Sequence, residues 1–463
     1  MSKLSKQTMD MTQGPLVGKI LRFSLPLMVT NLLQMLFNAA DVVVVGQFAG
    51  YDSLAAVGST SSIIYLFTNL LIGLGVGINV LIANFVGAGN RQKDIFLTLH
   101  TAITVGAVGG VVLGALGFVL TPWILRLVST PADIFAKTVL YLRIYFLGSV
   151  FVMLYNYGTA VLRAIGDTRR PLIFLLISGL TNVVLNLYFV IGLGWDVAGV
   201  GVATVISQLL SAFLVLRCLS REKGAWRYHW KCFFVHRQSL YEICRIGIPA
   251  GIQACLFSLS NVAIQGAINA YGSIIVAANS AAANIENFLY IAINSFHQAS
   301  MTFISQNLGA GKWARVKKVA ATCLTLAFFL GLFEGLCMLL WSPQLMELFN
   351  GNPQVIAAGT VRLHWVGALY VIFGCADVLV GSIRGFGITM GPMLINLLGT
   401  CLFRLVWIWY IKAPAVPVEM VYLSYPISWV LILIALSFYW VYVYRHYASR
   451  HNNQVKKLAA ENG

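Results

Sequence analysis

Residues 84–93 read NFVGAGNRQK and residues 306–315 read QNLGAGKWAR, so a glycine–alanine–glycine motif followed by basic residues occurs twice in the chain. A second motif, LRAIGDTRRP at 162–171, returns as IRGFGITMGP at 383–392. The offset is 222 residues for the first pair and 221 for the second. So steady an offset predicts a chain made of two equivalent halves.

Long apolar runs fill both halves. Of the 463 residues, 59% are hydrophobic and 10% charged, and mean hydropathy is +0.81, whereas soluble domains carry about 25% charged residues. Runs of about 20 residues can cross a bilayer of ~30 Å as helices, and they are longer than the ~10-residue strands of membrane barrels. Twelve spans are predicted, at 20–46, 55–83, 97–120, 140–162, 172–193, 199–219, 246–270, 276–305, 319–342, 363–383, 393–411 and 421–445.

These spans predict an all-α polytopic membrane protein with twelve transmembrane helices in two parallel-repeat six-helix bundles. The halves are parallel because each has an even number of spans. Such repeats are typical of secondary transporters, whose site lies at the repeat interface. No segment resembles an ion-selectivity filter, so the sequence does not indicate a channel. No cleavable signal peptide is evident. The predicted parts are a first bundle at 1–219, a cytoplasmic linker at 220–245, a second bundle at 246–445 and a cytoplasmic tail at 446–463.

The net charge of +16 follows the predicted topology. With a cytoplasmic N-terminus, 25 of the 31 lysines and arginines fall on the cytoplasmic side, which is the positive-inside pattern. We therefore expect a cell inner (plasma) membrane protein with both termini in the cytoplasm. Topology and contact with anionic lipid explain the charge, so no nucleic-acid partner is expected. The six outer residues are Arg126, Lys137, Arg143, Arg362, Arg404 and Lys412.

Asp41 is a carboxylate inside the first span, where an ionisable group is a functional hypothesis by default. Topology places Asn182, Asn186 and Thr204 at the same depth in the same bundle. One carboxylate, two amides and a hydroxyl form a hard-oxygen set suited to Na⁺, and the carboxyl could equally carry a proton. The alternative is an interhelical hydrogen-bond cluster that only holds the bundle together. These four residues are the predicted cation-coupling site, and a metal site only if Na⁺ is the coupling ion.

Further polar residues inside the spans are candidates for a substrate cavity. Of the 15 acidic residues, four fall within spans, and Arg404, within the span 393–411, is the exception of opposite charge. Intramembrane charge is therefore expected to be mainly acidic, which favours cationic substrates over anionic lipid-linked ones. Glu334 has no polar residue one turn away. The cavity candidates are Gln34, Asn38, Glu286, Tyr290, His297 and Asp377.

Other features carry structural predictions. Pro26 and its repeat mate Pro249 lie within the first span of each bundle, as helix-bending points or as tolerated kinks. Gly106, Gly110 and Gly114 have the spacing of close helix packing. The eight cysteines are scattered, so neither a disulfide nor a cysteine metal site is expected. No catalytic constellation appears, so we expect no enzyme and no cofactor.

The chain resembles the multidrug and toxic compound extrusion (MATE) family, in its bacterial NorM/MepA-like form, over essentially its whole length. The resemblance implies two six-helix bundles in a V and cation-driven efflux by rocker-type exchange. The family's first-bundle cation site maps onto Asp41, Asn182, Asn186 and Thr204, although some members have aspartate at the position of Asn186. The NorM-type acidic position on helix seven is Phe257 here. The motifs are ADVVVVGQFAGYDSLAAVG, both GAG loops, VLRAIGDTRRP, NVVLN and AGVGVATVISQ.

The expected function is a secondary active multidrug efflux antiporter that exports organic cations in exchange for H⁺ or Na⁺ by alternating access. Its expected partners are cationic amphipathic small molecules and the lipid bilayer, and we expect a monomer. Protonation or Na⁺ binding at Asp41 would compete with drug release or shift the first helix. One alternative is a lipid or oligosaccharide flippase of the related superfamily. Another is a membrane scaffold or receptor that transports nothing.

Overall fold

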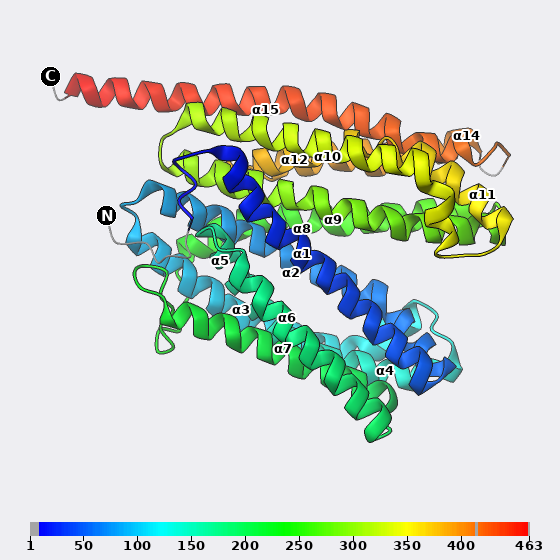
Figure 1. Ribbon diagram of the computed structural model, residues 1–463. Coiled ribbons are helices and arrows are strands. Elements are labelled where there is room, and N and C mark those ends of the chain that lie inside the picture. Colours follow the sequence, from blue (N-terminus) through cyan, green and yellow to red (C-terminus); the bar gives the residue numbers. More distant parts are fainter. Residues whose placement is uncertain (1–8, 413–414, 462–463) are drawn as a thin grey trace. The chain divides into compact units, whose positions relative to one another are not determined.

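A computed structural model describes residues 9–412 and 415–461, and the regular elements within those ranges are helices (Figure 1). The all-α fold is therefore confirmed. Their bounds are α1 (Leu16–Val44), η1 (Val45–Ala49), α2 (Tyr51–Ala88), α3 (Gln92–Leu127), α4 (Ala132–Leu147), α5 (Ser149–Ala164), α6 (Arg169–Leu187), η2 (Tyr188–Gly192), α7 (Asp196–Arg221), α8 (Arg237–Asn269), α9 (Ser273–Gly309), α10 (Trp313–Glu347), α11 (Pro353–Arg362), η3 (Leu363–Gly367), α12 (Tyr370–Arg384), α13 (Met390–Asn396), η4 (Leu397–Leu402), α14 (Phe403–Ile411) and α15 (Glu419–Glu461).

Ten helices among the described residues are long and apolar enough to cross a membrane, and the number reaches twelve if each of two bent pairs counts as one span. The first pair joins α4 to α5 at 44°, and the second joins Pro353–Gly367 to α12 at 43°. These pairs coincide with the predicted spans 140–162 and 363–383, but both begin earlier in the chain. The early turns were missed because the α4 start carries polar residues such as Asp133, which interrupt an apolar run.

The chain divides into two compact units, each of which is described by itself. Unit 1 includes Arg22–Gly251, and unit 2 includes Met11–Leu21 together with the chain from Ile252 onward. Helices α1 and α8 therefore each contribute to both units. Pro26 and Pro249 lie inside these two continuous helices, and their role as bending points stays a prediction.

Glycines allow close packing of helices in each unit. On α3 the Gly106–Gly114 pattern is buried, and a side chain at Gly110 would collide with the backbone of Val150 on α5. In unit 2, a Cβ atom at Gly331 on α10 would lie 2.8 Å from the Cα atom of Val371 on α12. The predicted close packing is confirmed, and it recurs at the offset of the sequence repeat.

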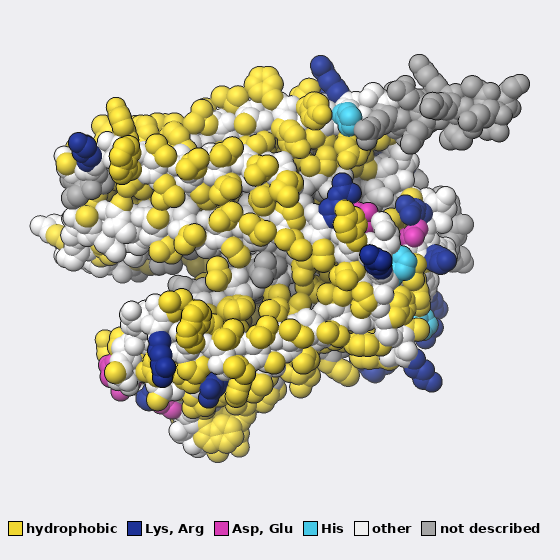
Figure 2. Space-filling view, turned by 180° about the vertical axis from the view of Figure 1, so that it is seen from behind, with side chains coloured by type: hydrophobic (Ala, Val, Ile, Leu, Met, Phe, Trp, Pro, Cys, Tyr) yellow, Lys and Arg dark blue, Asp and Glu magenta, His cyan; other side chains and the backbone are white. Residues whose placement is uncertain are grey.

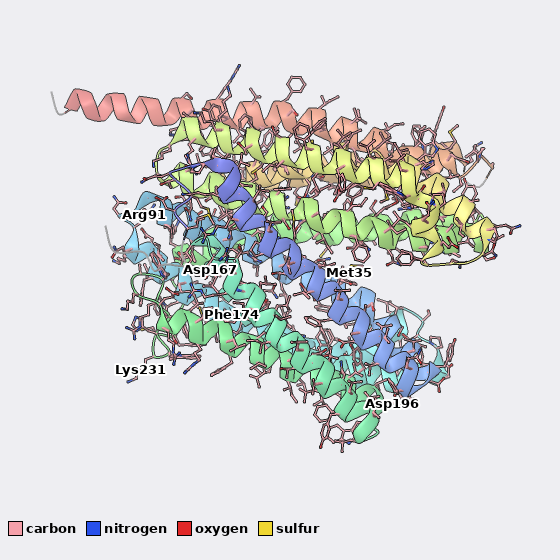
Figure 3. All side chains as sticks on the ribbon, viewed as in Figure 1. Met35, Arg91, Asp167, Phe174, Asp196 and Lys231 are labelled. Atoms are coloured by element: carbon pink, nitrogen blue, oxygen red, sulfur yellow. The ribbon has the colours of Figure 1, made fainter. Side chains whose placement is uncertain are left out.

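Ion pairs join neighbouring helices at both ends of unit 1 (Figure 3). At one end Asp167 accepts from the backbone N–H of Arg169 at 3.1 Å, and Arg170 pairs with both Asp167 and Glu222. These contacts tie the start of α6 to the end of α7. Asp196, at the opposite end in Figure 3, pairs with Lys137 on α4 at 2.8 Å.

The surface agrees with a chain embedded in lipid. Figure 2 shows hydrophobic side chains over the middle of the helices and Lys and Arg side chains gathered towards their ends. Bulky exposed residues such as Phe329, Phe333 and Leu340 lie on the middle of α10. Since water does not solvate such apolar surface favourably, this distribution is what a membrane span requires.

Candidate functional site

The polar residues predicted in the first half meet in unit 1 around the side chain of Asn186. Asn186 Nδ2 donates to Asp41 Oδ1 at 2.5 Å and to Asn182 Oδ1 at 3.2 Å. Asp41 lies near the end of α1, and both asparagines lie one turn apart on α6, which gives them a common face. The structure therefore brings three of the four predicted residues into one hydrogen-bonded cluster, the Asp41 cluster. Their role in cation coupling stays a prediction.

One buried oxygen of the Asp41 cluster, on the Asn186 amide, accepts no hydrogen bond from the described residues. Asn186 is 0% exposed and Asn182 is buried, while Asp41 is partly exposed. The Oδ1 atom of Asn186 is buried and has no hydrogen-bond partner among the described residues. A buried polar atom left without a partner costs about 1–3 kcal/mol. That oxygen is therefore available to a ligand that brings a proton or a positive charge.

Thr204 does not join the hydrogen bonds of the cluster. Its hydroxyl donates to the carbonyl oxygen of Val200, one turn earlier on α7, at 2.9 Å. Such a bond to the residue's own helix leaves lone pairs on the hydroxyl oxygen but no donor. Thr204 can therefore only accept in this conformation, as a cation ligand does.

The valines that follow Asp41 anchor the cluster to the core. Val42 and Val43 are exposed, whereas Val44 and Val45 are buried in an apolar cluster that also contains Val190 of η2. This core joins the ends of α1 and α6 directly beyond the polar residues. The position of Asp41 is thus fixed from one side by Asn186 and from the other by packed valines.

Both helices that carry the Asp41 cluster change to π-helix just after it. Segment η1 begins four residues after Asp41, and η2 begins two residues after Asn186. The same association recurs in unit 2, where η3 directly follows Arg362 and η4 ends two residues before Arg404. Turns of π-helix are rare and often occur at functional sites. No pattern in the sequence predicts these π-helical turns.

Two cavity candidates lie elsewhere on α1. Gln34 and Asn38 are exposed on this helix and make no hydrogen bond with another described residue. They are not brought into the Asp41 cluster, so their role as cavity-lining residues stays a prediction.

Glu286, another candidate, is the partner of a buried arginine in unit 2. The Arg362 guanidinium donates through Nε to Glu286 Oε1 at 2.9 Å and through Nη2 to Oε2 at 2.7 Å. Its Nη1 donates to Asn279 Oδ1 at 2.5 Å, and Asn279 in turn donates to Gln265 at 2.7 Å. Arg362 therefore neutralises Glu286, which presents no free negative charge.

The remaining candidates lie on α9 and α12. His297 Nδ1 lies 3.1 Å from Asp377 Oδ1 and 2.9 Å from the Asp377 carbonyl oxygen. Arg384 Nη1 lies 3.4 Å from His297 Nε2, so one imidazole joins a carboxylate to a guanidinium. The second carboxylate oxygen of Asp377 is buried without a partner among the described residues. Tyr290 accepts from Asn294 at 3.0 Å and makes no hydrogen bond to this group.

The expectation of mainly acidic intramembrane charge is wrong for unit 2. Arg362, Arg384 and Arg404 are all buried there, alongside three buried or partly buried carboxylates. Arg362 was predicted to lie in an outer segment and Arg384 was not singled out, because both residues directly flank the predicted span 363–383. Extending that span by one turn at each end would have revealed both. The same contacts weaken the charge argument against anionic substrates.

Comparison with known proteins gives a consistent result. The profile of the MatE family matches residues 26–188 and 249–410, once in each half of the chain. The probable multidrug resistance protein YoeA of Bacillus subtilis is 26% identical, over 91% of this chain and 93% of that protein. The probable multidrug resistance protein NorM of Thermotoga maritima is 26% identical, over 87% of each chain. The crystal structure of MATE in complex with MaD3S has a TM-score of 0.89 at 20% identity, covering 96% of this chain and 100% of that one.

Proposed function

This chain belongs to the MATE family of multidrug efflux transporters, as its repeated motifs predicted, and we propose that it exports organic cations in exchange for H⁺ or Na⁺. The Asp41 cluster is the coupling site in this proposal. The family is one of transporters and not of enzymes, and relatives named as multidrug resistance proteins do not favour the flippase alternative. The proposed location is the cell membrane, with both termini cytoplasmic.

The observation that carries the proposal is the place of the Asn186 amide. Its nitrogen lies between two oxygens, at 2.5 Å from Asp41 and 3.2 Å from Asn182, where it meets them as a cation would. Turning the amide over would exchange this nitrogen for Oδ1, the oxygen that has no partner. Three oxygens would then converge on one point. A protonated Asp41 could then donate to this buried amide oxygen, or Na⁺ could bind among the three oxygens once they move apart.

This exchange links cation binding to helix α1. When the Asn186 amide donates to Asp41, it ties α1 to α6 through a charge-assisted hydrogen bond. A proton or Na⁺ on Asp41 neutralises the carboxylate, so the hydrogen bond from Asn186 is no longer strengthened by charge. The cation therefore changes how the end of α1 is held, and the adjacent π-helical turns of η1 and η2 are where the helices would adjust.

We further propose that the substrates are amphipathic cations and that a single chain is sufficient for transport. Asp377 supports the first point, because one of its carboxylate oxygens is buried and unpaired among the described residues. The second rests on the Asp41 cluster, whose three members come from one unit of one chain.

The test is drug flux in proteoliposomes with an imposed H⁺ or Na⁺ gradient and a panel of cationic dyes. Wild-type protein should move at least one dye with one of the two gradients, and Asp41→Asn should move none. Asp52→Asn is the matched control, because it removes an exposed carboxylate from α2. Dye export by Asp41→Asn at the wild-type rate would refute the proposal. Movement of a lipid-linked sugar without any dye would favour the flippase.

A further inference from the structure

In unit 2, a second group of buried polar and aromatic side chains lies on α11, α14 and α15 and shares no residue with the Asp41 cluster. Arg404, near the start of α14, is 1% exposed. Its guanidinium lies 4.1 Å from the ring centre of Tyr425 and 5.9 Å from that of Trp429, both on α15. Arg362 at the end of α11 lies 5.3 Å from the same Tyr425 ring. Figure 1 shows α11, α14 and the start of α15 at one end of this unit.

Charge in this group is not balanced. Glu286 takes both of its carboxylate oxygens to Arg362, so that pair is neutral. Arg404 has no carboxylate within 4.0 Å among the described residues, and its Nε atom donates only to the hydroxyl of Ser428 at 3.0 Å. A buried charge is normally paired, because desolvation costs more than contact with an aromatic ring returns. The group therefore contains one buried guanidinium that makes no ion pair with a carboxylate among the described residues.

The same group contains several hydrogen-bond donors without acceptors. The Nη2 atom of Arg404, the indole Nε1 of Trp429 and the hydroxyl of Tyr422 are buried, and none has a partner among the described residues. Arginine and tryptophan can only donate, so neither can satisfy the other, and the Tyr422 hydroxyl is a neutral acceptor. Tyr422 adjoins Arg362, whose guanidinium lies 5.5 Å from its ring centre. What the group lacks is an acceptor with negative charge.

We propose that Arg404, Arg362, Trp429 and Tyr422 form a binding site for an anion. The anion is either a small inorganic ion such as chloride or one carboxylate or phosphate group of a transported molecule. The Arg404 guanidinium supplies the charge, Arg362 lies across the Tyr425 ring from the same group, and the indole and phenol donors complete the contacts. This site lies entirely in unit 2 and does not depend on the proposed cation exchange at Asp41, so each idea can fail without the other.

The experiment uses the full-length protein, purified in a neutral detergent with methanesulfonate, which carries neither a carboxylate nor a phosphate, as the background anion. Chloride is titrated at constant ionic strength, and the thermal unfolding midpoint is recorded, since a ligand that binds the folded state raises it saturably. Sodium phosphate and sodium benzoate are then titrated in the same way. A saturable response to benzoate or phosphate shows that the site accepts a carboxylate or phosphate group, and a response to chloride alone shows that it accepts only a small halide.

Variants decide whether the response comes from this site. Arg404→Gln should raise the half-saturating anion concentration by about tenfold or more, the effect of losing one charge-assisted hydrogen bond. Tyr422→Phe removes only the hydroxyl, and Trp429→Phe replaces the indole with a smaller aromatic ring that has no donor, so both should fold and show a smaller loss. Trp409→Phe is the control, because this α14 residue is 80% exposed. The proposal would be overturned if the wild-type protein showed no saturable response. It would also be overturned if Arg404→Gln and Trp429→Phe responded to the anion as the wild-type protein does.

Discussion

The hydrogen bond between Asn186 and Asp41 makes a quantitative prediction about stability. Replacing Asn186 with leucine keeps its approximate size but removes both of its bonds, at 2.5 and 3.2 Å. A hydrogen bond to a charged group contributes about 1.5–3 kcal/mol, and one between neutral groups about 0.5–1.5 kcal/mol. Because Asn186 is 0% exposed, water does not replace the lost donor. We expect Asn186→Leu to lower the free energy of unfolding by about 2–4 kcal/mol.

A double-mutant cycle isolates the bond to Asp41 from the rest of this loss. Asp41→Asn, Asn186→Leu and the double variant are unfolded by denaturant in the same mixed micelles. The interaction free energy of the pair should be about 1–3 kcal/mol. In the control cycle, Asp41→Asn is combined with Thr204→Val, whose hydroxyl bonds only to Val200. That cycle should be additive to about 0.5 kcal/mol. Equal interaction energies in the two cycles would refute the geometry of the cluster.

Three further predictions concern the rest of the chain. Glu286→Gln should destabilise the protein by about 3–5 kcal/mol, measured by denaturant unfolding, because it leaves the buried Arg362 charge unpaired. Gly110→Ala should cost about 1–3 kcal/mol in the same measurement, because the added methyl group meets the backbone of Val150. In a variant from which the eight native cysteines have been removed, a cysteine introduced at Lys231 should react with a membrane-impermeant reagent only from the cytoplasmic side.

Each of these predictions has a matched control. The double variant Glu286→Leu with Arg362→Met should recover most of the lost stability, because replacing a whole buried ion pair is often neutral. Gly266→Ala should change stability little, since nothing lies within 4 Å of the added atom. A cysteine at Tyr51, which is the first residue of α2 and is 81% exposed, should react only from outside in the same background. Labelling of both cysteines from one side would contradict the proposed topology.

The sequence was sufficient to place the Asp41 cluster. Asp41 and the two asparagines lie in spans whose predicted directions agree, so their common depth followed from the predicted topology, and their contact required only that α1 and α6 be neighbours. Thr204 has the same depth, but its hydroxyl bonds to Val200. That choice depends on a side-chain rotamer, which the spacing of polar residues does not determine.

The pairing of Glu286 with Arg362 was beyond the same reasoning. The two residues are 76 positions apart, and Arg362 stands just outside the apolar run that defined its span. An apolar run ends where the charge begins, whereas a helix continues through a charge that has a partner. The π-helical turns were also not predicted. A turn with one extra residue is still part of the same apolar run, so the hydrophobic pattern does not reveal it.

The most direct test of the account is counter-ion movement driven by the substrate. Proteoliposomes with no ion gradient receive a gradient of a transported dye, and H⁺ is followed with a pH indicator and Na⁺ with a radioactive tracer. The account predicts that wild-type protein and Asp52→Asn move one of the two cations against the dye, and that Asp41→Asn moves neither. Movement of the same cation by Asp41→Asn at the wild-type ratio to dye would contradict coupling at Asp41.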